Sequence, residues 1–200
     1  MKKYIDTREK TLIDYIKEKT VLDLGVGDTS DRFLHKFISD NAKEVIGVEL
    51  DEKRAEKLKN IGYKIHVGNA EEINLNKKFD VVIAGDLIEH VNNVGLFLEN
   101  VKRHLQEGGY FIFNTPNIFS INFLLRGLFF GGNVKQFPEH VYGFNKDMIR
   151  ELARRYNLSI KKEIYFSHHE KNIRSYIIRL LSLISKRRNE NILYVIEAKD

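Results

Sequence analysis

Short apolar runs alternate along this chain with segments in which apolar residues recur every three or four positions. Runs of this length predict strands that are buried on both faces, and the helical spacing predicts amphipathic helices. The predicted strands are 21–24, 44–50, 63–67, 79–84, 110–113, 158–166 and 191–198. Strands that alternate with helices predict an α/β fold, a Rossmann-like three-layer α/β/α sandwich built on a mostly parallel sheet.

Helices are predicted between most of these strands by spacing and by residues that cap helix ends. Asp6 to Glu9 resembles a capping box, Asn145 is an N-cap residue, and Gly108-Gly109 is typical of a helix end. The predicted helices are a first one through Leu12 and Ile16, one ending near Ser39, 52–60, one from Val94 through Leu105, one from Asn145 to Tyr156, and 173–184.

The regular alternation breaks between Ile118 and Pro138, a segment rich in phenylalanine and glycine. Its apolar part, 118–130, predicts either a lid over an apolar acceptor or a hydrophobic surface for a partner or a membrane. The basic amphipathic segment 171–188 has two interpretations as well: it packs on the sheet, or it contacts an anionic membrane peripherally. We therefore expect a single domain over 1–200, with a substrate-lid insertion at about 117–140 and a helical insertion at about 170–188.

Composition narrows the class of protein. The chain has 200 residues, is 42% hydrophobic and 30% charged, and has a net charge of +5, as in a globular protein of one domain. It contains no cysteine, which excludes disulfides, thiolate metal sites and a cysteine nucleophile. The N-terminal residues lack the apolar core of a signal peptide, and no 18-residue apolar stretch exists, so we expect a cytoplasmic protein. Basic residues are not interleaved with aromatics, so we expect no DNA partner.

A glycine turn between the first strand and the second helix is the strongest local signal. Gly25 and Gly27 follow the strand directly, so the backbone there can approach a ligand closely. Ser30 stands where a dinucleotide-binding loop has a third glycine or alanine, and Asp23 and Asp28 place two carboxylates beside the turn. Negative charge disfavours a pyrophosphate and suits a ligand that carries an amine or a sulfonium.

Polar residues follow the other predicted strands, at the edge where open α/β sheets bind ligands. Glu49 ends the second strand, and its carboxylate can accept both hydroxyls of a ribose. Asn69 follows the third strand and can bond to an adenine edge. The fourth strand is followed by Asp86, Glu89 and His90, and the fifth by Asn114 and Asn117. A nucleoside with a positively charged tail fits these groups better than a dinucleotide.

Four motifs follow one another within about residues 18–166, in the order of the family named next. They are Val-Leu-Asp-Leu-Gly-Val-Gly, Gly-Val-Glu-Leu, Gly-Asn-Ala-Glu-Glu-Ile and Phe-Asp-Val-Val-Ile-Ala-Gly-Asp-Leu-Ile-Glu-His-Val. The chain resembles the seven-strand methyltransferases that depend on S-adenosylmethionine. The resemblance implies that the last strand is antiparallel and lies between the fifth and sixth. The cofactor residues it implies are Asp23, Gly25 and Gly27 at the methionine part, Glu49 at the ribose, Asn69 and Ala70 at the adenine, and Asp86 beside them.

Glu89-His90 resembles a smaller group of methyltransferases that act on small metabolites, quinone precursors and sugars. In ubiquinone-pathway and small-RNA 2′-O-methyltransferases an acid-x-x-Glu-His motif binds a divalent metal. Asp86, Glu89 and His90 keep that spacing here, and His140 is a candidate fourth ligand. Oxygen and imidazole ligands of this kind suit Mg²⁺ or Mn²⁺. Alternatively, Glu89 only starts a helix, and His140 is a packed structural histidine.

The sequence thus predicts an O-methyltransferase for a small or lipid-like hydroxylated acceptor. His140 or His90 is the expected base, since an unperturbed histidine titrates near neutral pH, and Glu89 completes the catalytic set. N-methylation, an RNA 2′-O-acceptor, a cofactor-binding protein without turnover and a nucleotide-dependent oxidoreductase stay open. The sequence names neither the acceptor nor the oligomeric state.

Overall fold

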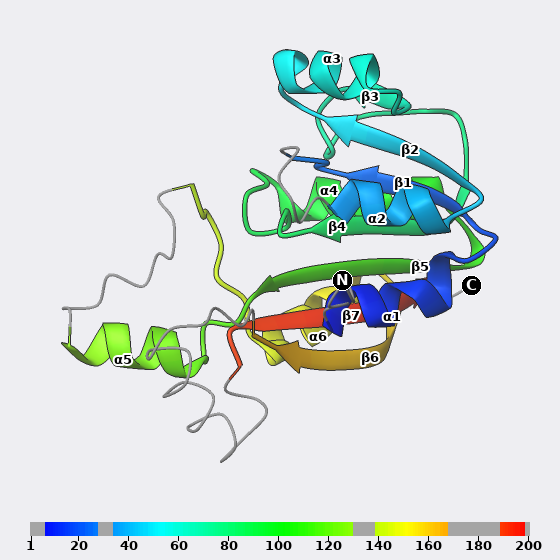
Figure 1. Ribbon diagram of the computed structural model, residues 1–200. Helices are drawn as coiled ribbons and strands as arrows, with labels where there is room; N and C mark the ends of the chain where they lie inside the picture. Colours follow the sequence, from blue (N-terminus) through cyan, green and yellow to red (C-terminus); the bar gives the residue numbers. More distant parts are fainter. Residues whose placement is uncertain (1–6, 28–33, 130–138, 168–188, 199–200) are drawn as a thin grey trace.

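The computed structural model describes residues 7–27, 34–129, 139–167 and 189–198 (Figure 1). Seven strands form one sheet in the order β3-β2-β1-β4-β5-β7-β6. The strands are β1 (Thr20–Leu24), β2 (Glu44–Glu49), β3 (Ile65–Val67), β4 (Phe79–Gly85), β5 (Leu105–Pro116), β6 (Leu158–Phe166) and β7 (Asn191–Ala198). β7 pairs antiparallel with both β5 and β6, while the other pairs are parallel. The predicted mostly parallel sheet with its last strand reversed is confirmed.

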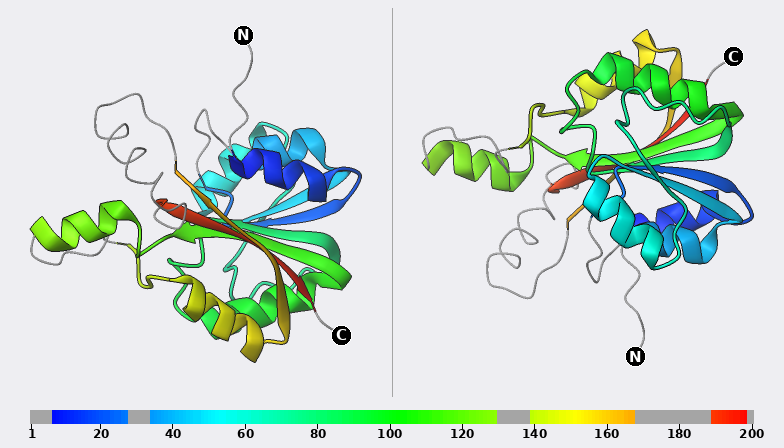
Figure 2. Two further views of the ribbon diagram at one scale, coloured as in Figure 1. Left: turned by 90° about the horizontal axis from the view of Figure 1, so that it is seen from below. Right: turned by 90° about the horizontal axis from the view of Figure 1, so that it is seen from above.

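Helices cover both faces of the sheet, which gives the predicted three layers (Figure 2). On one face lie α1 (Thr7–Ile16), α2 (Leu34–Asn41) and α3 (Glu52–Asn60); on the other lie α4 (Val94–His104) and α6 (Lys146–Arg155). A further helix, α5 (Ile121–Phe129), extends beyond the carboxyl ends of the parallel strands. No helix in the described ranges is both long enough and apolar enough to cross a bilayer.

The core forms because each central strand presents apolar residues to both helical layers. In β1, Leu22 and Leu24 face the layer of α4 and α6, whereas Val21 faces α1 and α2. All three side chains are fully buried. Such continuous apolar strands are expected for a parallel sheet covered on both sides. The core therefore fixes the strands rigidly and leaves their carboxyl ends for ligand chemistry.

The boundary between α4 and β5 differs from the sequence prediction. The helix ends at His104 rather than near Gly108-Gly109, because Leu105 already has extended backbone angles and pairs with Phe79. The pairing shifts after that position, and Gly109 passes so close to the neighbouring backbone that a Cβ atom there would lie 3.0 Å from the Asp80 carbonyl oxygen. The two glycines therefore serve an irregularity in β5 rather than a helix end.

The aromatic segment after β5 contains a helix that the sequence analysis did not predict. Ser120 starts α5: the Phe123 N–H lies 3.3 Å from its hydroxyl oxygen, and the Leu124 N–H donates to its carbonyl. Serine is a favoured N-cap residue. The predicted helix 173–184 and the loop residues Asp28 and Ser30 lie outside the described residues.

Candidate active site

The glycine turn after β1 has the backbone shape that the sequence predicts. Gly25 and Gly27 have φ angles of 71° and 75°, a region that favours glycine. A Cβ atom on Gly25 would also lie 2.8 Å from Leu87. The Gly25 N–H donates to the carbonyl of Val48 over 2.9 Å, so the turn is tied to the end of β2. The hydrogen bond fixes the turn at the carboxyl edge of the sheet, and the missing Cβ atoms leave its backbone accessible to a ligand.

Glu49 binds the same turn through its side chain. One carboxylate oxygen accepts the Gly27 N–H over 2.9 Å, and the other accepts the Asp51 N–H over 3.0 Å. The Nε atom of Arg54 lies 3.5 Å from Oε1 of Glu49, and Glu49 is 4% exposed. A carboxylate has about four lone-pair sites, so two remain for ribose hydroxyls. The predicted ribose acid lies beside the glycine turn and also supports it.

The segment after β3 is fixed by its own hydrogen bonds. The Asn69 side-chain oxygen accepts the Glu71 N–H over 3.0 Å, and the Ala70 carbonyl accepts the Asn100 amide over 2.9 Å. The Glu71 carboxylate in turn accepts the N–H groups of Asn92 and Asn93, in the loop after β4. The sequence analysis did not single out Glu71, although its motif contains it. The loop after β3 and the loop after β4 are therefore fixed to each other by hydrogen bonds.

Asp23 lies on the α2 side of the sheet. Its carboxylate is 2.8 Å from Nδ1 of His35, and the two residues are 2% and 1% exposed. The sequence analysis did not single out His35, because twelve positions separate it from Asp23 and no local motif connects the two residues. A cofactor contact by Asp23 stays a prediction; what the structure contains is a buried pair beneath the glycine turn.

Arg8 is a site residue that the sequence analysis missed. Its guanidinium lies 3.5 Å from the Asp86 carboxylate, and its side chain is 12% exposed. Asp86 has a φ of 49° and accepts a short hydrogen bond from the side-chain amide of Asn114. Within the described residues, the Arg8 Nε atom is buried without a hydrogen-bond partner. Arg8 therefore places a partly buried positive charge at the ends of β4 and β5, close to Gly85.

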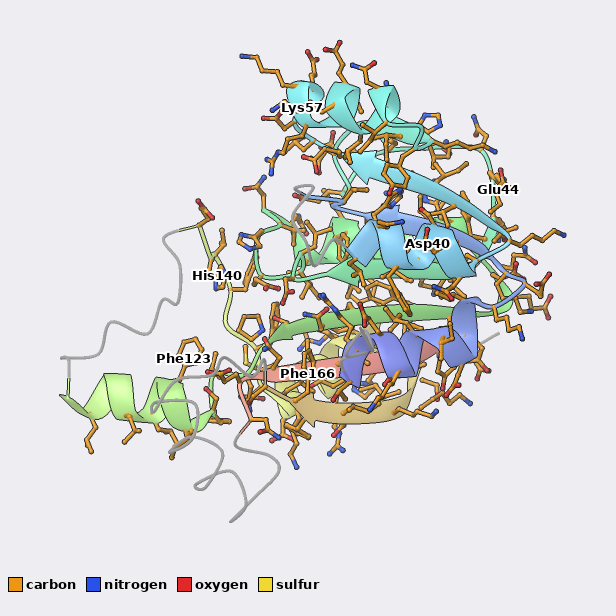
Figure 3. All side chains as sticks on the ribbon, in the orientation of Figure 1. Asp40, Glu44, Lys57, Phe123, His140 and Phe166 are labelled. Carbon is orange, nitrogen blue, oxygen red and sulfur yellow. The ribbon has the colours of Figure 1, made fainter. Side chains whose placement is uncertain are left out.

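Glu89, His90 and His140 meet at the same edge. One ligand atom from each lies within 4.8 Å of the others, and the two imidazole centroids are 4.6 Å apart. Figure 3 shows His140 beside the strand ends, away from Glu44 at the opposite end of β2. Asp86, the fourth predicted ligand, is not part of this group. Three of the four predicted metal ligands are thus together, and Asp86 contacts Arg8 and Asn114 instead.

A short segment after α5 holds His140 in place. The N–H groups of Val141 and Tyr142 both donate to the Glu89 carbonyl, over 2.9 and 3.2 Å. The Tyr142 hydroxyl donates to the Asn92 carbonyl over 2.8 Å. Residues 50 positions apart are therefore joined, and the backbone that follows His140 is hydrogen-bonded to Glu89, the residue before His90.

Burial changes the proton affinities of this cluster. Burial and, second, the charge of Asp86 raise the pKa of Glu89 to about 8, so this carboxyl is protonated at neutral pH. Burial and, second, the neighbouring His90 lower the pKa of His140 below its usual value. A neutral imidazole can accept a proton. Glu89 and His140 therefore place a protonated carboxyl close to an imidazole that can accept a proton.

A family model described as "Methyltransferase domain" matches residues 2–163, most of the chain. The chain belongs to this methyltransferase family. The match covers the glycine turn, Glu49 and the Glu89–His140 cluster. Its structural neighbours are S-adenosylmethionine-dependent methyltransferases, as the sequence motifs predicted.

Two curated relatives are ubiquinone biosynthesis O-methyltransferases. The one from Bradyrhizobium diazoefficiens is 31% identical over 103 residues, which cover 48% of this chain and 40% of the relative. The one from Pelagibacter ubique is 26% identical over 162 residues, covering 74% and 64%. The chain thus spans less than two thirds of the length of these relatives.

Solved structures agree on the fold. A methyltransferase from Archaeoglobus fulgidus superposes with a TM-score of 0.69 at 16% identity, covering 95% of this chain and 91% of the other. One from Clostridium acetobutylicum superposes with a TM-score of 0.66 at 16% identity, covering 96% and 89%. Both are described as S-adenosylmethionine-dependent.

Proposed function

We propose that this methyltransferase transfers the methyl group of S-adenosylmethionine to a hydroxyl of a small or lipid-like acceptor. The observation that carries the proposal is the pairing of His90 with His140 at the edge that also holds the glycine turn. An oxygen acceptor must lose its proton as it is methylated, and a histidine of lowered pKa can take it. The names of the curated relatives favour O-methylation.

The residues at the edge fit each part of the cofactor. Gly25 and Gly27 leave the backbone close to a ligand, and Glu49 has lone pairs left for the ribose. Arg8 offers a partly buried guanidinium for the carboxylate of the methionine part, because its Nε atom has no partner in the described chain. The bound cofactor supplies an activated methyl group on a sulfonium.

The protein's own work is positioning and proton transfer. The backbone bonds from Val141 and Tyr142 to Glu89 fix the chain next to His140, which supports a role of its imidazole in positioning an acceptor hydroxyl. His140 then takes the hydroxyl proton on an imidazole nitrogen. Protonated Glu89 can donate a hydrogen bond to the acceptor's second oxygen.

The three-residue cluster also fits a divalent cation. Glu89, His90 and His140 can each offer a ligand atom, and both carboxylate oxygens of Glu89 lack a hydrogen-bond partner among the described residues. Mg²⁺ or Mn²⁺ there would lower the pKa of an acceptor hydroxyl. Binding would first have to displace the Glu89 proton, so Mn²⁺ affinity should rise with pH.

The first test is calorimetric titration with S-adenosylhomocysteine, with NAD as the control ligand. Micromolar affinity for the first compound alone supports the cofactor assignment, and no binding would favour a protein without turnover. His140→Ala should keep that affinity and abolish release of S-adenosylhomocysteine with a panel of phenols and catechols. His66→Ala, an exposed histidine, is the matched control. Lost cofactor affinity in His140→Ala would mark the residue as structural.

A further inference from the structure

Helix α5 differs from the other helices in what it covers. The α1, α3, α4 and α6 helices each bury at least two residues against the sheet. In α5, none of the residues whose burial the structure describes is buried, and the helix extends away from the sheet in all three views (Figures 1 and 2). It is therefore an apolar helix without a protein layer over it in the described part of the chain.

The exposed side chains of this segment are large and apolar. Leu128 is 76% exposed, Leu124 is 39% exposed, and Phe119, just before the helix, is 53% exposed. Ile121, Leu124, Leu125 and Leu128 follow helical spacing, so they form one stripe. A continuous stripe of this kind indicates an interaction surface, in contrast to single exposed apolar residues.

The charge of the segment around the stripe indicates which kind of partner surface the stripe would bind. Between Ile118 and Pro138 the sequence contains Arg126 and Lys135 but no aspartate or glutamate, and the whole chain has a net charge of +5. A second copy would bring the same positive segment against itself, which is unfavourable. An anionic lipid surface matches both the apolar stripe and the positive charge.

The base of α5 is joined to the segment that carries His140. Asn117 and Phe144 form a β-bridge at the base of α5, and Phe144 is four positions after His140. The same stretch that leads into α5 is thus tied to the segment that holds the proposed base. A surface bound by α5 would therefore lie at the same end of the sheet as His140.

We propose that α5 docks this protein on an anionic lipid bilayer, with Leu124 and Leu128 inserted at the boundary between head groups and acyl chains. The docking itself does not depend on the proposed reaction. If the reaction is as proposed, docking presents the site to an acceptor that resides in the membrane.

Co-sedimentation with vesicles tests this docking. The wild type should bind vesicles of equal parts phosphatidylglycerol and phosphatidylcholine, and bind less in high salt or to phosphatidylcholine alone. Leu128→Asp and Leu124→Asp should each reduce the partition coefficient about tenfold or more, because a charge replaces an inserted apolar side chain. Ile61→Asp, at the end of α3, is the matched control, since Ile61 is 62% exposed and should leave binding unchanged.

Three outcomes would overturn the proposal: no binding of the wild type to the anionic vesicles, an equal loss in Ile61→Asp, or full binding by both leucine variants. Sedimentation velocity adds a fourth, because a wild-type dimer that Leu128→Asp dissociates, without vesicle binding, would make α5 a subunit interface. Circular dichroism and urea unfolding show whether each variant is folded, independently of any ligand. Failure of the cofactor assignment would appear instead as absent binding of S-adenosylhomocysteine by the wild type.

Discussion

Replacing Glu49 by alanine should weaken both the fold and cofactor binding, because one carboxylate serves both. It accepts the Gly27 N–H over 2.9 Å and the Asp51 N–H over 3.0 Å. Each hydrogen bond to a charged group contributes about 1.5–3 kcal/mol. Water can reach the partly exposed turn in the variant, so we expect the free energy of unfolding to fall by about 3 kcal/mol, the lower end for two such bonds.

Cofactor affinity should fall as well. In the variant, two ribose hydroxyls would lose the carboxylate that accepts their hydrogen bonds. The glycine turn would also lose the hydrogen bond from the Gly27 N–H to Glu49. A loss of about 1–3 kcal/mol corresponds to roughly 5- to 150-fold weaker binding of S-adenosylhomocysteine. Urea unfolding measures the first effect and calorimetric titration the second. Glu49→Gln should be intermediate, since an amide oxygen can still accept the Gly27 N–H, while its NH₂ cannot accept from Asp51.

The outcomes separate the two roles. Glu56→Ala, an exposed acid on α3, is the control and should change neither quantity measurably. A destabilised Glu49→Ala protein with unchanged affinity would refute the ribose assignment. Unchanged stability and unchanged affinity would refute the hydrogen-bond reasoning itself.

Two further predictions concern buried ionisable groups. The folded protein keeps a proton on Glu89, of pKa about 8, that the unfolded chain, of pKa near 4.5, has lost. Between these values rising pH should therefore lower stability, by up to about 1.4 kcal/mol per pH unit, and urea unfolding of Glu89→Gln should show a flatter pH profile. His35→Ala leaves the Asp23 carboxylate buried without its 2.8 Å contact and should cost about 1.5–3 kcal/mol in the same assay. Equal stability of His35→Ala and the exposed-site control His66→Ala would contradict this.

The sequence predicts the sheet well because parallel strands that are buried on both faces are mostly apolar, and such runs are easily recognised. β1, β2 and β4 appear as mostly apolar runs, in which Asp23 and Asp80 are the only charged interior residues. The ends of these strands place Glu49 and Glu89 at one edge by topology alone. The start of β5 was not predictable in this way. Gly108-Gly109 is typical of a helix end, and only the close approach of Gly109 to the backbone of β4 reveals the irregularity.

Site residues from distant segments are the ones that sequence reasoning missed. Arg8 reaches Asp86 across 78 positions, and Asp23 meets His35 from another element. Neither pair has a spacing rule, because the contact depends on how α1 and α2 pack on the sheet. By contrast, α5 has local signals that the sequence analysis did not use, namely Ser120 as an N-cap residue and the helical spacing of Ile121, Leu124 and Leu128.

The position of β7 has a consequence for how this chain is made. β7 lies between β5 and β6, so each of these strands keeps an open hydrogen-bonding edge until residues 191–198 leave the ribosome. Open strand edges pair readily with other chains. The nascent chain is therefore most prone to aggregate just before β7 is synthesised, and a chaperone that shields β5 and β6 would matter most at that moment.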